Sequence, residues 1–168
     1  IAPFEDMHNE RRELKMPDES TIQVQLLDTC KDISTFASRN HKNADCVILL
    51  YDITSQQSFI PIMRDIEEIK ASTPPDTTFF LVGNKIDREE LRQVSLTAAL
   101  HLAKEHHLKY LEISVKTGVG TEKLFHWTAQ VSMKIQCIRR SRGKSFPAIR
   151  LKRKSNKSRR GLYRNSCS

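Results

Sequence analysis

Three short polar segments carry the residues best suited to chemistry. Each follows a run of apolar residues: Asn84-Lys85-Ile86-Asp87 comes after Phe79–Val82, Ser114–Gly118 after Tyr110–Ile113, and Asp28–Asp32 after Thr21–Leu27. If these runs are strands of an open parallel sheet, the polar segments leave their carboxyl ends, where such sheets bind ligands. We therefore expect the three segments to lie along one binding edge.

The first two segments have the groups needed to recognise a planar base. The carboxylate of Asp87 only accepts hydrogen bonds and can accept two in parallel. Guanine presents two adjacent donors on one edge, its N1–H and its exocyclic amine, whereas adenine does not. Asn84 can join the base to a neighbouring loop, and the aliphatic stem of Lys85 can lie along a ring. The alternative is an ordinary polar turn, which the four residues alone would favour. The second loop, after the next strand, favours guanine.

The apolar pattern predicts the strands that hold these segments. Val47–Tyr51 and Phe79–Val82 are short continuous apolar runs, typical of parallel strands buried on both faces. Thr21–Leu27 alternates apolar and polar residues, and Tyr110–Ile113 is a fourth candidate. A fifth strand is expected within Phe4–Leu14. Helical patterns alternate with the later strands, which indicates an α/β fold with a mostly parallel sheet.

Three amphipathic helices are expected between and after these strands. The first follows Ser55 and ends before Pro74-Pro75, the second follows Ser95, and the third begins at Gly120-Thr121. Their apolar stripes are expected to face the core. These are Phe59, Ile62, Met63, Ile66 and Ile69; Ala98, Ala99, Leu102 and Ala103; and Leu124, Thr128, Val131, Ile135 and Ile138.

The positive charge of the chain is concentrated at one end. Of 28 Lys and Arg residues, 12 lie in 139–168, which contains no acidic residue, although the whole chain of 168 residues carries a net charge of +8. Residues 1–138 therefore carry 16 basic and 20 acidic residues, a net charge of −4. We predict a single domain over 1–138 and a disordered basic tail over 139–168.

The basic tail has several possible roles. Arg150–Arg160 is suited to an anionic membrane surface, to nuclear import or to nucleic-acid phosphates. Because no aromatic residues alternate with the charges, specific nucleic-acid recognition is not expected. Cys167 is penultimate, but Asn165-Ser166-Cys167-Ser168 is not a C-a-a-X sequence, so we expect an unmodified thiol and keep lipidation of Cys167 as the alternative.

The order and spacing of several stretches resemble the Ras superfamily of small GTPases, and its Rab branch most closely. These stretches are Leu27-Asp28-Thr29, Ala44–Phe59, Leu81–Asp87, Arg92–Ser95 and Leu111–Phe125. The resemblance covers about Thr21 to Ile138. It implies the three-layer fold of P-loop NTPases and a protein that binds GTP or GDP with Mg²⁺.

The resemblance also implies roles for individual residues. Asn84, Lys85 and Asp87 correspond to the guanine-specificity motif. Ser114-Val115-Lys116 corresponds to the Ser-Ala-Lys loop, in which a backbone N–H reaches the guanine oxygen and the Lys stem flanks the base. Val115 replaces the usual Ala, keeping that N–H but adding bulk. Asp28 stands where the family has an Asp that holds Mg²⁺ through water.

The part of the sequence that would bind phosphate departs from the family. The 168 residues contain no G-x-x-x-x-G-K-[ST] segment. Where the family has Asp-Thr-Ala-Gly-Gln, this chain has Asp28-Thr29-Cys30-Lys31-Asp32. Lys31 thus replaces the glycine at the γ-phosphate, and Asp32 replaces the Gln that orients water. A carboxylate at that position repels phosphate oxygens, so we assign no catalytic residue and expect slow or absent hydrolysis.

By family topology, a first strand lies between the strands predicted at 21–27 and 47–51. Without it, two central strands would leave backbone groups unpaired, at about 1–3 kcal/mol for each buried group. The sequence also begins with Ile1 rather than Met. We therefore expect an upstream piece with the phosphate loop, the first helix and the switch region. The alternative is a truncated gene product.

The main functional hypothesis is a Rab-like guanine-nucleotide-binding protein in vesicle trafficking or signalling, with effector and regulator proteins as partners. The alternative is a pseudo-GTPase that binds no nucleotide and uses the fold for interactions, and a third hypothesis gives the tail a nuclear role. Four scattered cysteines with no C-x-x-C pair favour reduced thiols. We expect a cytoplasmic protein, peripheral on a cytosolic membrane face, with the nucleus as the alternative.

Overall fold

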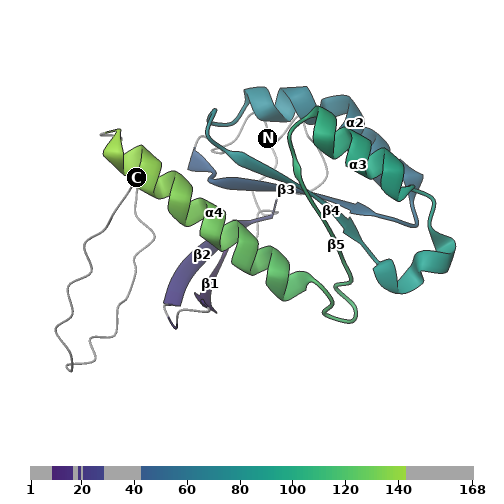
Figure 1. Ribbon diagram of the computed structural model, residues 1–168, viewed down its shortest axis with the longest axis horizontal. Helices are drawn as coiled ribbons and strands as arrows, with labels where there is room; N and C mark the ends of the chain where they lie inside the picture. Colours follow the sequence, from purple (N-terminus) through teal and green to yellow (C-terminus); the bar gives the residue numbers. More distant parts are fainter. Residues whose placement is uncertain (1–8, 17–18, 20, 29–42, 143–168) are drawn as a thin grey trace, which may run out of the picture.

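The computed structural model describes residues 9–16, 19, 21–28 and 43–142 (Figure 1). Strands β1 (Asn9–Lys15) and β2 (Thr21–Leu27) form an antiparallel hairpin. Strands β3 (Cys46–Asp52), β4 (Thr78–Asn84) and β5 (Lys109–Ile113) form a parallel sheet in the order β3-β4-β5. All five predicted strands are confirmed.

Helices cover both faces of the parallel sheet. The helices α2 (Gln56–Ala71) and α3 (Leu96–Glu105) lie on one face, and α4 (Thr121–Ser141) lies on the other (Figure 1). A short 3₁₀ helix, η2 (Ile86–Leu91), follows β4. The connections between successive parallel strands run through helices, as crossover units require. The predicted three-layer α/β fold is confirmed.

The alternating side chains of β4 show why its sequence is apolar throughout. Phe79 and Leu81 pack into the core under α2 and α3, whereas Phe80 and Val82 pack against α4. All four side chains are buried. A strand at the centre of a parallel sheet must be apolar on both faces because helices cover both. The prediction of a strand buried on both faces is therefore confirmed for β4. For β3 it is wrong at Leu50, which is 52% exposed.

The predicted helix stripes are largely buried, with three exceptions. Met63 is 52% exposed, Ile138 is 44% exposed, and Ala98 is also exposed. Consecutive residues are about 100° apart around a helix, so Met63 and Ala98 lie beside the inward stripes that contain Ile62 and Ala99. The assignment of these three residues to the core was wrong.

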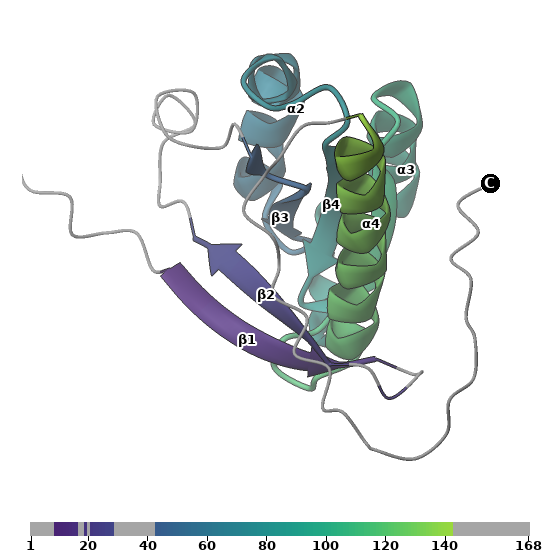
Figure 2. The same ribbon diagram turned by 90° about the vertical axis from the view of Figure 1, so that its left-hand side faces the viewer.

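Helix α4 contacts both sheets. Its Leu124 packs with the β4 and β5 side chains, while Ala129 packs with Met16 and Ile22 of the hairpin. The Lys15 carbonyl lies 3.0 Å from Nε2 of His126, also on α4. No described strand pairs with both β2 and β3, so the hairpin is a separate sheet (Figure 2).

Arg139 corrects the predicted start of the tail. Helix α4 continues to Ser141, and the Arg139 side chain is buried. Its guanidinium donates two hydrogen bonds to Asp76, of 2.9 and 2.8 Å, and one of 2.8 Å to Asp45. Asp45 and Asp76 precede β3 and β4, so Arg139 joins the last turn of α4 to the amino ends of two strands. The helical pattern of apolar residues in α4 ends at Ile138. The helix nevertheless has one more buried residue, Arg139, because its charge is paired with two carboxylates.

We predict that Arg139→Met lowers the free energy of unfolding by about 3–5 kcal/mol, because removing one partner leaves two half-buried carboxylates without their cation. Urea unfolding of the full chain measures this change. Arg140→Met is the matched control, since Arg140 is exposed on the same helical turn, and it should change stability by less than about 0.5 kcal/mol. Equal unfolding midpoints for the two variants would contradict the structural role of Arg139.

Several predictions fall outside the described residues. The predicted roles of Lys31 and Asp32 lie there, as does the tail from residue 143 with Cys167. Among the described residues, no helix is both long and apolar enough to cross a membrane.

Candidate functional site

The register of the parallel sheet places three strand ends side by side. Asp52 at the end of β3 is opposite Asn84 at the end of β4, and Asn84 is opposite Ile113 at the end of β5. The loops that begin at Asn84 and Ser114 therefore leave the same edge from adjacent strands. The expectation that the polar segments share one edge is confirmed for these two. It is not confirmed for the segment that begins at Asp28, because β2 belongs to the separate antiparallel hairpin.

The side chain of Asn84 ties the two loops together. Its Oδ1 accepts a hydrogen bond of 2.8 Å from the backbone N–H of Lys85 and one of 3.1 Å from that of Val115. This is the loop-joining role expected of Asn84. It also has a consequence for Val115: the N–H that the family resemblance assigns to the guanine oxygen donates to Asn84 here.

Asp87 is held by the second loop. Its Oδ1 accepts a 2.6 Å hydrogen bond from the hydroxyl of Ser114, which is fully buried. The Ser114 Oγ in turn accepts a 3.2 Å bond from the N–H of Thr117. Because the Ser114 hydroxyl bonds to the charged form, it holds the pKa of Asp87 below its ordinary value. Asp87 is thus an oriented anion at the edge of the sheet.

Lys85 takes a partner that sequence reasoning missed. Its backbone is left-handed, with φ of 73°, and its ammonium forms an ion pair with Asp52. The Asp52 Oδ1 also accepts hydrogen bonds of 2.8 and 2.7 Å from the N–H and hydroxyl of Thr54. Burial opposes ionisation of Asp52, but the bonds from Lys85 and Thr54 outweigh it and lower the pKa. The sequence could have identified Asp52 as a residue of this site, because it directly follows the predicted strand Val47–Tyr51.

The remaining residues of the second loop face solvent. Val115 is 60% exposed, and the Lys116 side chain is 75% exposed with its Nζ 3.9 Å from Asp87 Oδ2. An exposed Val115 side chain adds bulk next to the loop, as expected from its replacement of Ala. The stems of Lys85 and Lys116 extend from the two neighbouring loops that Asn84 joins.

The described residues give limited support to a metal site. Asp28 is exposed at the end of β2. Within the described ranges, no group of three or more His, Cys, Asp or Glu side chains could hold a metal ion. Mg²⁺ in nucleotide sites commonly uses one or two carboxylates, with phosphates and waters as the other ligands. A single carboxylate is compatible with that pattern but does not form a metal site by itself.

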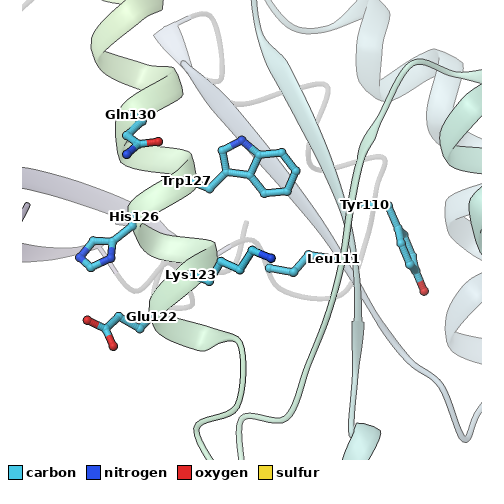
Figure 3. Close-up of a pocket in the computed structure, with 7 residues that line it drawn as sticks. All are labelled: Tyr110, Leu111, Glu122, Lys123, His126, Trp127 and Gln130. Carbon is cyan, nitrogen blue, oxygen red and sulfur yellow. The ribbon is translucent and has the colours of Figure 1, made fainter. Parts of the chain in front are cut away.

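A hollow lies between β5 and α4 (Figure 3). It is lined by Tyr110, Leu111, Glu122, Lys123, His126, Trp127 and Gln130. The ammonium of Lys109 lies 5.2 Å from the centre of the Trp127 ring. None of the predicted base-binding residues lines this hollow, so it is separate from the candidate site.

The fold and the paired loops are those of a small-GTPase domain. The sequence matches the Ras family over residues 5–134, and the chain belongs to that family. This confirms the predicted Ras-superfamily membership.

Several of the relatives that the chain resembles carry Rab names. It is 32% identical to the Ras-related protein Rab-4 of Dictyostelium discoideum, over 62% of this chain and 52% of that protein. It is 34% identical to Rab-1 of Theileria parva, over 64% of this chain and 50% of that protein. It is 32% identical to Rab-13 of Rattus norvegicus, over 76% of this chain and 64% of that protein. The chain is therefore Rab-like, and it spans about half the length of most of these relatives.

We predict that Ser114→Ala raises the pKa of Asp87 towards its ordinary value, because the hydroxyl that stabilises the ionised form is removed. Titration of the Asp87 carboxyl by NMR measures this shift. In the unaltered chain the lowered pKa contributes stability above the unfolded-state pKa, and this contribution is lost as the pH falls through the folded-state pKa.

Ser95→Ala is the control for this titration. Ser95 caps α3 through the Ala98 N–H, at 3.1 Å, and has no bond to Asp87. The Asp87 titration should be unchanged in this variant. An Asp87 pKa that is equally unchanged in Ser114→Ala would show that the hydrogen bond is not formed in solution.

Proposed function

We propose that this chain binds the guanine base of GTP or GDP through the two loops at the carboxyl edge of β4 and β5. The residues involved are Asn84, Lys85, Asp87, Ser114, Val115 and Lys116. The observation that supports this proposal most directly is the Ser114–Asp87 hydrogen bond of 2.6 Å, which fixes an ionised carboxylate between the loops. An oriented carboxylate is the acceptor that the two adjacent donors of guanine require.

We propose a different task for each group. The Asp87 carboxylate accepts from the N1–H and amine of guanine while Ser114 holds one of its oxygens. The Val115 N–H approaches the guanine oxygen and must share its proton with Asn84 or release that 3.1 Å bond. The stems of Lys85 and Lys116 cover the two faces of the ring. Base binding thus needs a small rearrangement at Val115 and none at Asp87.

Mg²⁺ is the cofactor that membership in this family implies. When bound, it neutralises charge on the phosphate oxygens. Asp28 is the residue proposed to hold it, through a water molecule. The replacement of Gln by Asp32 and of Gly by Lys31 supports slow or absent hydrolysis of bound GTP.

We predict that Asp87→Asn weakens GDP binding by about 10- to 150-fold, because one acceptor for a guanine donor becomes a donor, and bonds to charged groups contribute about 1.5–3 kcal/mol each. Xanthosine diphosphate should gain affinity, since xanthine has a carbonyl in place of the guanine amine. Calorimetric titration of the full chain with each nucleotide and Mg²⁺ measures both changes.

Glu90→Gln is the matched control for this substitution, because Glu90 is an exposed acid on the same short helix η2. It should leave both affinities unchanged. If the Asp87→Asn variant binds GDP as tightly as the unaltered chain does, Asp87 does not recognise the base.

The hydrolysis proposal has its own test. The double substitution Lys31→Gly with Asp32→Gln restores the family residues, and we expect it to raise the single-turnover rate of GTP hydrolysis by about tenfold or more, because water and γ-phosphate are then positioned rather than repelled. Release of inorganic phosphate from bound GTP measures the rate. A rate no higher than that of the unaltered chain would show that these two positions do not limit hydrolysis.

The cellular role proposed for this chain follows from its Rab-named relatives. We propose a function in vesicle trafficking, with effector and regulator proteins as partners. The basic tail would add attraction to an anionic membrane surface on the cytosolic side, at about 1 kcal/mol per basic residue near the surface.

One observation favours a second candidate, a pseudo-GTPase that acts as an interaction module. The groups assigned to the base already have partners within the protein: Val115 with Asn84, Asp87 with Ser114, and Lys85 with Asp52. A site satisfied in this way is stable without a ligand. This candidate predicts no affinity for GDP and no loss of protein partners in Asp87→Ala.

A further inference from the structure

Arg92 lies directly after η2 and pairs with two carboxylates from different parts of the chain. Its Nε and Nη2 donate to Glu89 at 2.7 and 2.6 Å. Its Nη1 and Nη2 donate to Glu112 on β5 at 2.8 and 3.0 Å. The Arg92 side chain is only 15% exposed. One guanidinium therefore joins the segment that carries Asp87 to the strand that leads to Ser114.

Each carboxylate partner of Arg92 is close in sequence to a residue of the proposed base site. Glu89 is two residues after Asp87, and Glu112 is two residues before Ser114. The Arg92 bridge and the Ser114–Asp87 hydrogen bond thus connect the same two segments at two separate points. Two points of attachment restrict rotation of one segment against the other, which a single hydrogen bond does not.

We propose that Arg92 is a positioning residue that sets guanine specificity by fixing the Asp87 segment against the Ser114 loop. This inference rests on the proposed function, because it concerns the same base site. Arg92 makes no contact with Asp87 itself in the structure; it acts through Glu89, Glu112 and the backbone between them. Its effect falls on the Asp87 carboxylate, the group that reads the guanine amine.

Glu112 is also held by a residue of its own strand, at the same oxygen that accepts from Arg92 Nη1. The hydroxyl of Tyr110 donates a 2.6 Å hydrogen bond to Glu112 Oε1. Because that bond uses the only Tyr110 hydroxyl proton, the 3.0 Å contact between the two tyrosine oxygens has Tyr51 as the donor. The chain of bonds runs from Tyr51 on β3 to Tyr110 and Glu112 on β5 and ends at Arg92.

Gly83 on β4 makes room for this chain of bonds. A Cβ atom at position 83 would lie 2.8 Å from the Tyr51 hydroxyl oxygen and 3.1 Å from Ile53 Cγ2. Only a residue without a side chain lets Tyr51 reach across β4 to Tyr110. The glycine before Asn84 is thereby explained by the packing of the Arg92 network.

The guanidinium group suits this position in a way that an ammonium does not. Arg presents a rigid fork of five donors, which here serves two carboxylates at once, whereas Lys is a point charge on a flexible stem. Glu112 is about 20% exposed, so part of its charge is removed from water and needs a partner. Arg92→Lys keeps the charge but loses the two-sided bridge.

The test compares Arg92→Met with the control Arg64→Met in the full chain. Arg64 also makes a two-bond pair with a carboxylate, Asp65, but both residues are neighbours on α2 and join no separate segments. The readouts are the Asp87 pKa by NMR and the affinities for GDP and inosine diphosphate with Mg²⁺. Hypoxanthine lacks only the amine of guanine and keeps its N1–H, so the ratio of the two affinities isolates the contact between that amine and Asp87.

In Arg92→Met we expect GDP affinity to fall by about 10- to 100-fold, since displacement of a positioned group by about 1 Å has effects of this size. Inosine diphosphate affinity should fall less, so the preference for GDP decreases, and the Asp87 pKa should rise. Arg64→Met should match the unaltered chain. A uniform loss of both affinities with an unchanged Asp87 pKa would indicate a structural role only and overturn the proposal.

Arg92→Lys covers the case in which Arg92→Met does not fold. It should shift the GDP preference and the Asp87 pKa in the same directions, and unaltered values would overturn the proposal. If the unaltered chain binds neither nucleotide, the proposed function fails and the Asp87 pKa alone decides the role of Arg92: a rise in the variants supports it, and no change rejects it.

Discussion

The in-register parallel pairing of β3, β4 and β5 is the constraint on which the candidate site depends. It places Asp52, Asn84 and Ile113 opposite one another, so residues far apart in the sequence begin their loops at the same edge. A slip of one residue would turn every β4 side chain to the other face. Phe79 and Leu81 face one helical layer, and Phe80 and Val82 face the other. The hydrophobic core thus fixes the register, and the register fixes the site.

Both ends of the sheet are held by an arginine that bridges two carboxylates. Arg139 connects α4 to Asp45 and Asp76 before the amino ends of β3 and β4. At the opposite end, Arg92 connects the segment after β4 to Glu112 on β5. Each arginine bridge connects carboxylates on different elements. The bridges fix the relative positions of these elements more tightly than burial of apolar surface alone would. The polar contacts therefore set the geometry of the loops.

The elements and the two loops of the candidate site were predictable because they depend on local patterns. Apolar runs and turn residues define β3, β4 and β5 without knowledge of their neighbours, and the carboxyl-edge rule then brings Asn84 and Ser114 together. The partners of Arg139 and Arg92 were not predictable, since a charged residue has no periodic signature and their contacts span up to 96 residues. The sequence predicted that Asn84 would join the two loops, but not that its partner would be the Val115 N–H, because that choice depends on how the two loops meet.

The most direct test of guanine recognition uses the nucleosides, which have no phosphate. Guanosine and adenosine should be titrated separately into the ¹⁵N-labelled full chain while its backbone amide signals are recorded. We predict that guanosine shifts the signals of Lys85, Asp87, Val115 and Lys116, and that the Val115 N–H responds as its bond to Asn84 changes. Adenosine should leave these signals in place. Equal shifts with both nucleosides, or none with guanosine, would contradict this prediction.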